Sequence, residues 1–175
     1  HVLCEKPMAM TIDETERMIA VCRENKVSLS VAIYRRAFPV VVKLKELLDE
    51  GRIGRPLSVH INNYTPFLSD EDNPWRLDPA CSGGGILMDV GSHRLDLMSL
   101  LFGAPAQVQG IADGQTLSKQ VDDAAVICLR WPNQVLGSAN FHWNTPIAKD
   151  DLTVVGTEGT LSVQELSGQG ELTLE

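Results

Sequence analysis

Residues 124–143 read AAVICLRWPNQVLGSANFHW, and the class of fold follows from this stretch. Its two mostly apolar halves, Ala124–Trp131 and Val135–Trp143, are typical of strands, and Pro132-Asn133-Gln134 between them is a turn signal. Consecutive short strands joined by a tight turn pair in antiparallel fashion. The stretch therefore predicts a hairpin within an antiparallel sheet.

Further strands are predicted on both sides of this hairpin. Ala106–Ala112 precedes it, and Leu152–Val155 and Thr160–Val163 follow it, with the turn residues Gly-Thr-Glu-Gly at 156–159 between the last two. The final residues, 171–174, have the same strand-like character. The second half of the chain is therefore expected to form one sheet.

The middle of the chain alternates between helix and strand signals. Apolar residues recur at helical spacing from Pro39 to Gly51 and again over Ile86–Phe102, whereas Leu57–Tyr64 alternates like a half-buried strand. A polar loop over residues 65–82 separates that strand from the second helix. Helices combined with an antiparallel sheet indicate the α+β class.

The first 34 residues have a different organisation. Val2-Leu3-Cys4 is a short apolar run, and Thr11 with Glu14 forms a capping box for a helix over Ile12–Asn25. Val27–Tyr34 then reads as a second strand. Strand, capped helix and strand make a βαβ unit, whose two strands are normally parallel. We therefore expect residues 1–34 to be the tail of a doubly wound domain and residues 35–175 to form a second domain.

Composition and charge narrow the class of protein. The chain has 175 residues, of which 43% are hydrophobic and 22% charged, and its formal net charge is −8. This charge argues against nucleic acid or an anionic membrane as the main partner, and neither a membrane-spanning run nor a signal peptide is visible. The cysteines form no CxxC pair, so we expect no metal site, no disulfide scaffold and a cytoplasmic location. They are Cys4, Cys22, Cys81 and Cys128.

Glu5-Lys6-Pro7 is the first candidate site, because it follows a predicted parallel strand directly. Ligands of open α/β sheets bind at the carboxyl ends of the strands. A lysine there can place its ammonium beside a substrate hydroxyl or a cofactor ribose, and Pro7 fixes the backbone through either a trans or a cis bond. The tripeptide alone is equally compatible with a solvated lysine in a turn.

The second candidate is the block Gly83–Asp96, in which Asp89 and His93 are four residues apart. On a helix this spacing puts both side chains on one face. An imidazole can accept or donate the proton that moves when an alcohol becomes a ketone, and a carboxylate beside it can orient the ring or bind a hydroxyl. The glycines are expected to leave free amides near a ligand. A purely structural Asp–His pair remains the alternative.

Tyr34-Arg35-Arg36 and Trp75-Arg76 are the remaining clusters in which aromatic and basic residues adjoin. A guanidinium fork and an aromatic ring face together suit a polyol. The alternative is that the arginines face solvent and Trp75 packs within its loop.

Taken in order, these pieces resemble the Gfo/Idh/MocA family of nicotinamide-dependent oxidoreductases, the family of glucose-fructose oxidoreductase and inositol dehydrogenase. Each piece is weak alone, but the resemblance covers nearly the whole chain. The matching pieces are residues 2–7, Tyr34-Arg35-Arg36 before the Pro39 helix, residues 50–54, Trp75-Arg76, the block 83–96 and residues 155–159.

The resemblance implies a role for each candidate residue. Lys6 corresponds to a catalytic lysine, His93 to a proton donor or acceptor, and Asp89 to a catalytic residue that also binds substrate. Glu5, Lys6 and Pro7 would contact an NAD or NADP cofactor. The substrate would be a sugar or polyol. Tyr34, Trp75, Arg76 and Asp89 would bind it.

The resemblance also implies an architecture. It predicts the end of a Rossmann domain followed by an open, mainly antiparallel sheet with helices on one face. The other, apolar face would be buried against a second copy of the protein. The glycine fingerprint of a Rossmann domain is not found, so we expect a complete enzyme to be longer and this chain alone to bind the cofactor weakly. A non-catalytic sugar-binding module and an oligomerisation domain remain alternatives.

Overall fold

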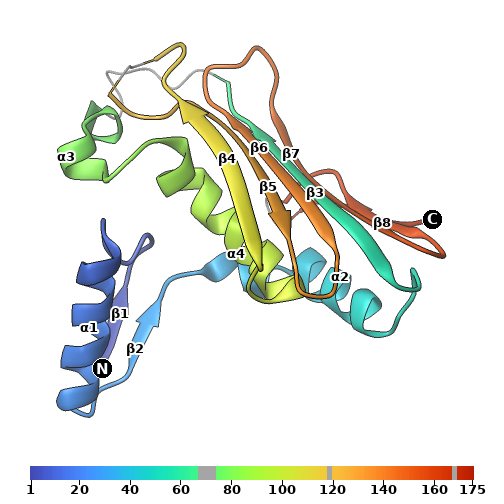
Figure 1. The fold of residues 1–175 in the computed structure, drawn as a ribbon, viewed down its shortest axis with the longest axis horizontal. Coiled ribbons are helices and arrows are strands. Elements are labelled where there is room, and N and C mark those ends of the chain that lie inside the picture. Colours follow the sequence, from blue (N-terminus) through green and yellow to red (C-terminus); the bar gives the residue numbers. More distant parts are fainter. Residues whose placement is uncertain (67–73, 118–119, 167–168) are drawn as a thin grey trace.

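A computed structural model describes residues 1–66, 74–117, 120–166 and 169–175. Within these residues the chain forms a two-stranded parallel sheet and a separate seven-stranded sheet. Figure 1 shows the small sheet and its helix on one side of the molecule and the large sheet on the other. The predicted polar loop is described only in part, because its residues 67–73 lie outside these ranges.

The N-terminal unit is the predicted βαβ arrangement. Strand β1 (Val2–Cys4) pairs in parallel with β2 (Leu29–Val31), and helix α1 (Ile12–Glu24) connects them. The capping box is present, since the Glu14 amide donates to Thr11 Oγ1 at 3.2 Å and the Thr11 amide donates to Glu14 Oε2 at 3.0 Å. This pair of bonds satisfies amides that have no partner within the helix.

The second strand of this unit is shorter than predicted. Over the expected range Val27–Tyr34, only Leu29–Val31 pairs, because its partner β1 offers three residues. Tyr34 instead begins a 3-10 turn, η1 (Tyr34–Ala37), which leads into helix α2 (Pro39–Asp49). The prediction for Tyr34 as a strand residue was therefore wrong.

The large sheet is mixed and mainly antiparallel. Its order is β4-β5-β6-β3-β7-β8-β9, and within the described part of the chain β3 and β6 are its one parallel pair. The hairpin of residues 124–143 is confirmed as β5 and β6. The strands are β3 (Pro56–Tyr64), β4 (Gln107–Asp113), β5 (Ala124–Arg130), β6 (Leu136–His142), β7 (Lys149–Gly156), β8 (Thr160–Val163) and β9 (Leu172–Leu174).

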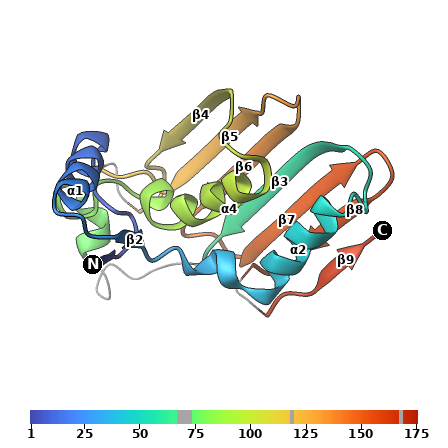
Figure 2. The same ribbon diagram turned by 90° about the horizontal axis from the view of Figure 1, so that it is seen from below.

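Helices α2 and α4 (Ser92–Phe102) cover one face of this sheet, as Figure 2 shows. The core lies between these helices and the sheet, where alternate residues of β3, β5, β6, β7 and β8 are buried. Its most buried large side chains include Leu44, Ile61, Leu97, Trp131, Phe141 and Leu152. Three short elements, η2 (Pro74–Leu77), α3 (Pro79–Ser82) and η3 (Leu87–Gly91), precede α4.

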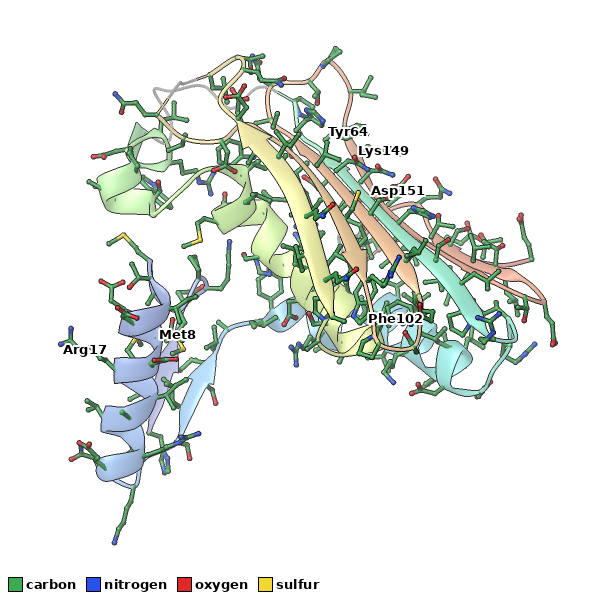
Figure 3. The ribbon with its side chains drawn as sticks, in the orientation of Figure 1. Met8, Arg17, Tyr64, Phe102, Lys149 and Asp151 are labelled. Carbon is green, nitrogen blue, oxygen red and sulfur yellow. The ribbon has the colours of Figure 1, made fainter. Side chains whose placement is uncertain are left out.

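The uncovered face of the sheet is more polar than expected. His60 lies between two hydroxyls of this face, with Nδ1 2.8 Å from Ser138 Oγ and Nε2 3.0 Å from Ser58 Oγ. At one end of the sheet Lys149 lies 2.9 Å from an Asp151 oxygen, beside the Tyr64 ring (Figure 3). On this face such polar residues lie beside exposed apolar ones, among them Val126 and Leu136.

Candidate active site

Lys6 and Asp89 meet across the boundary between the two sheets. The Lys6 ammonium donates to Asp89 Oδ1 at 2.7 Å and to the Asp89 main-chain oxygen at 2.8 Å. Both side chains are largely but not fully buried. The pair therefore fixes the ammonium at the carboxyl end of β1, where the sequence had placed a ligand site.

The local backbone positions each partner. Lys6 follows β1 within two residues, and the Lys6–Pro7 peptide bond is cis. Asp89 lies in η3, a π-type turn that runs directly into α4, so the predicted helix over Ile86–Phe102 is continuous and its first turn is π-helical. Such π-turns are frequent at functional sites.

Asp122 holds the start of this helical segment in place. Its carboxylate accepts hydrogen bonds from the Gly85 amide at 2.8 Å and the Leu87 amide at 2.9 Å, and its main-chain oxygen accepts from Ile86. The expectation that the glycines leave free amides for a ligand was therefore wrong. A Cβ at Gly85 would lie 1.8 Å from the Asp122 carbonyl oxygen, so close packing against Asp122 is what requires glycine there.

A cavity of about 300 Å³ borders the Lys6–Asp89 pair. Arg76 lines it, with Nε 3.4 Å from Asp89 Oδ2, and the Arg76 guanidinium lies 5.5 Å from the Trp75 ring centroid. Two cations thus share one carboxylate at the cavity wall. The full lining is Glu5, Lys6, Pro7, Trp75, Arg76, Ser82, Gly84, Met88, Asp89 and Trp143.

His93 and Tyr34 are not among the residues that line this cavity. The His93 ring is buried and packs edge-on against Tyr34, with ring centroids 5.3 Å apart. Its Nδ1 atom has no hydrogen-bond partner among the described residues. Burial, together with the positive charge of Lys6, lowers the pKa of His93 to about 4, so the ring is neutral near pH 7.

Two further arginines contribute positive charge beside His93. Arg94 is buried and binds Asp150 through two nitrogens, at 3.1 and 2.5 Å, while Arg35 lies 3.9 Å from the same carboxylate. Both guanidinium groups lower the pKa of His93 further. Asp150 neutralises one of these two charges, so the surroundings of the ring favour its uncharged form.

The sequence had given no sign of three groups in this region. Asp122 and the Arg94–Asp150 pair support the helix that carries Asp89, and Trp143 lines the cavity. Asp122, Asp150 and Trp143 are brought in by strands or loops of the large sheet, whereas Arg94 lies on α4. A run of acidic residues before β5 was the one available hint, and it does not by itself identify a helix cap.

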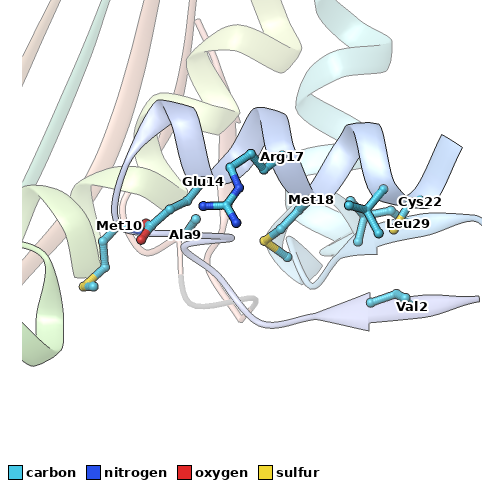
Figure 4. A pocket seen from close by; sticks show the side chains of 9 residues that line it. Val2, Ala9, Met10, Glu14, Arg17, Met18, Cys22 and Leu29 are labelled. Atoms are coloured by element: carbon cyan, nitrogen blue, oxygen red, sulfur yellow. The ribbon is translucent and has the colours of Figure 1, made fainter. Parts of the chain in front are cut away.

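A second, larger hollow of about 650 Å³ lies on the N-terminal unit (Figure 4). Met18, Cys22, Val2 and Leu29 line it with apolar surface, and no part of the Lys6–Asp89 pair reaches it. Among the described residues no group of three or more potential metal ligands gathers. In the same part of the chain, every helix is too short or too polar to cross a bilayer.

Sequence profiles of known families match both units. Residues 41–162 match the GFO/IDH/MocA C-terminal domain, and residues 1–33 match an oxidoreductase family with an NAD-binding Rossmann fold. The matched ranges cover the small parallel sheet and most of the large sheet.

Individual relatives agree with these profiles. The chain is 38% identical over 93% of its length to a D-xylose 1-dehydrogenase (NADP+) of Haloarcula marismortui, and 31% identical over 92% to a 1,5-anhydro-D-fructose reductase of Ensifer adhaerens. It covers 46% and 49% of those proteins, so it spans about half the length of the curated relatives it matches.

A solved structure shows the same arrangement. The WlbA dehydrogenase of Bordetella pertussis, in complex with NADH and UDP-GlcNAcA, superposes with a TM-score of 0.89 at 28% identity. The superposition covers 98% of this chain and 51% of that one. A levoglucosan dehydrogenase in complex with NADH superposes similarly, with a TM-score of 0.88 at 26% identity over 99% of this chain and 50% of that one.

Proposed function

Because the chain belongs to the GFO/IDH/MocA oxidoreductase family, we propose that it forms the substrate side of an enzyme that moves a hydride between NAD(P) and a sugar or polyol. The observation that carries this proposal is the Lys6–Asp89 pair at the wall of a cavity that charged and aromatic side chains line. The curated relatives with names of sugar-converting enzymes support the substrate class.

The residues at the end of β1 fit a nicotinamide cofactor. Glu5, Lys6 and Pro7 line the cavity, and Lys6 offers an ammonium at the strand end where such ligands bind. A cavity of about 300 Å³ suits one ring of a cofactor or a substrate, not an entire dinucleotide. When bound, NAD or NADP would supply the hydride acceptor or donor.

We assign the following roles to this chain's own residues. Lys6 stabilises negative charge that develops on the reacting oxygen, and Asp89 holds Lys6 in place and accepts a hydrogen bond from a substrate hydroxyl. His93, neutral near pH 7, accepts the hydroxyl proton when the alcohol is oxidised and returns it when the carbonyl is reduced. Arg76 donates to substrate hydroxyls and Trp75 offers its ring face. Tyr34, packed on His93, closes the substrate side of the site.

The direct test is turnover by the complete protein that contains this chain. Purified protein is mixed with NAD+ or NADP+ and a panel of aldoses, anhydrosugars and polyols, and nicotinamide reduction is recorded. We expect reduction with at least one member of the panel. Sugar binding without any reduction, in either cofactor, would favour a non-catalytic binding module instead.

We also propose that the open sheet face mediates self-association. Ile111 and Val126 pair across β4 and β5, and both are exposed, as is Leu136 on the same face. Exposed apolar patches rimmed by polar groups favour protein contacts. Sedimentation of the chain tests the association: Ile111→Lys is expected to shift the chain toward monomer.

We propose a cytoplasmic location as well. All four cysteines are unpaired, which suits a reducing compartment.

A further inference from the structure

Trp143 carries a buried hydrogen-bond donor that has no partner. It follows β6 directly, only 3% of its surface is exposed, and its main-chain amide donates to the Asp123 carbonyl oxygen at 2.8 Å. Among the described residues, nothing accepts a hydrogen bond from its indole nitrogen Nε1. An indole N–H is a donor only, and burying it without an acceptor is unfavourable.

Trp131, in the same sheet, shows the ordinary arrangement. It is fully buried at the end of β5, and its Nε1 donates to the Gly103 carbonyl oxygen at 2.9 Å. The fold therefore provides an acceptor for one buried indole and leaves the other without one. Buried polar groups that lack a protein partner often meet a ligand or an ordered water.

The position of Trp143 indicates which ligand. Trp143 lines the cavity that Lys6, Asp89 and Arg76 also line. Arg76 Nε is likewise buried and without a hydrogen-bond partner in the described part of the chain, although it lies 3.4 Å from Asp89 Oδ2. Two residues with unsatisfied N–H donors thus line one cavity, in which the Asp89 carboxylate is already bound by Lys6.

We propose that Trp143 is a substrate-specificity residue whose indole N–H donates a hydrogen bond to a hydroxyl oxygen of the bound sugar or polyol. The inference rests on the proposed function and extends it by naming a group that selects the substrate. A site built to bond a hydroxyl strongly disfavours an analogue that lacks it, because its own buried donor is then left unpaired. Trp143 therefore favours substrates that carry an acceptor oxygen at one defined position.

The test compares the complete protein with two variants over a series of mono-deoxy analogues of its substrate. Trp143→Phe removes the N–H, and replacing Trp143 by β-(3-benzothienyl)alanine removes it while keeping the bicyclic shape. Loss of one hydrogen bond predicts a fall of about 5- to 10-fold in kcat/KM for the full substrate, mainly through KM. For one deoxy analogue, the one that lacks the hydroxyl bound by Trp143, the wild type should have a low kcat/KM. Neither variant should have a lower kcat/KM than the wild type for that analogue.

Trp131→Phe is the matched control. It removes an indole that already has a protein partner, so it should lower stability and leave the ranking of the deoxy analogues unchanged. A benzothienyl variant that loses the same factor as the wild type on every deoxy analogue would overturn the proposal.

A second measurement separates this inference from the proposed function. Indole N–H resonances of the complete protein, assigned with the Phe variants, are followed during titration with the sugar. The Trp143 signal should shift and the Trp131 signal should not. A shift without turnover would refute hydride transfer and keep the donor role, whereas turnover with an unmoved Trp143 signal would refute the donor role alone.

Discussion

The Lys6 ammonium and Asp89 form two hydrogen bonds, one to the carboxylate and one to the main-chain oxygen, across 83 positions of sequence. This contact joins the end of the small parallel sheet to the π-turn that precedes α4. Because Arg76 approaches the other carboxylate oxygen, Asp89 is held from two sides. The geometry makes Asp89 the point at which the two units and the cavity meet.

The first prediction concerns the pH dependence of stability. The folded pKa of His93 lies near 4, below the ordinary value of 6.5, so the unfolded chain binds more protons between these values. Folding stability is therefore unaffected by this group above pH 6.5 and falls as the pH drops from 6.5 toward 4. We expect the loss from this group to be about 2 kcal/mol between pH 7 and pH 5.

Urea unfolding of the chain and of His93→Phe at several pH values measures this loss. The difference between the two proteins isolates His93, because other titrating groups are common to both. The variant should show the shallower dependence on pH. Parallel curves for the two proteins would mean that the imidazole is protonated as easily in the folded chain as in the unfolded one.

The second prediction concerns turnover in the complete protein. His93→Ala should lower kcat by roughly 10²–10⁴-fold, the usual contribution of a positioned acid or base. Cofactor affinity should change little, since His93 lies beside Tyr34 rather than at the end of β1. Steady-state kinetics with varied cofactor concentration distinguish the two effects, and an unchanged kcat would remove His93 from proton transfer.

The third prediction concerns the support of the π-turn. Asp122→Ala removes the acceptor for two backbone amides, so we expect the free energy of unfolding to fall by about 1–2 kcal/mol. Asp113→Ala is the control, because Asp113 is an exposed residue of β4. Its effect should stay within about 0.5 kcal/mol. Equal losses for both variants, measured by chemical unfolding, would contradict the capping role.

The fourth prediction concerns cofactor binding by the 175-residue chain itself. The candidate cofactor site in its described residues consists of the end of β1 and a cavity of about 300 Å³, so calorimetry with NAD(H) or NADP(H) should detect very weak binding. Micromolar affinity would show that these residues bind far more of the cofactor than Glu5, Lys6 and Pro7 can contact.

Local signals in the sequence were reliable guides to local structure. The capping box of Thr11 and Glu14, the turn at 132–134 and the alternation over residues 57–64 each predicted what the structure shows. The position of β3 between β6 and β7 was not predictable, because its pairing joins distant segments and one pair is parallel. Strand periodicity indicates a face, but not which strand lies beside it.

The candidate site was predictable to a similar extent. Motif order drew attention to Lys6 and Asp89, which the structure places in contact, while the roles of both remain predictions. Trp143 and Asp122 reach the region only through tertiary packing, so no spacing rule connects them to Asp89. On the open face, His60 contacts Ser138 of another strand, and an alternating pattern predicts which face a residue lies on but not such contacts between strands.

Turnover of the complete protein after replacement of Lys6 tests the central claim most directly. Lys6→Met removes the ammonium while nearly keeping the side-chain length. The matched control is Lys149→Met, because Lys149 is an exposed lysine that also pairs with an aspartate but does not line the cavity. We predict that Lys6→Met reduces nicotinamide with a sugar or polyol at least about 100-fold more slowly than the wild type, and that Lys149→Met keeps its rate. Equal rates for wild type and Lys6→Met would contradict the account.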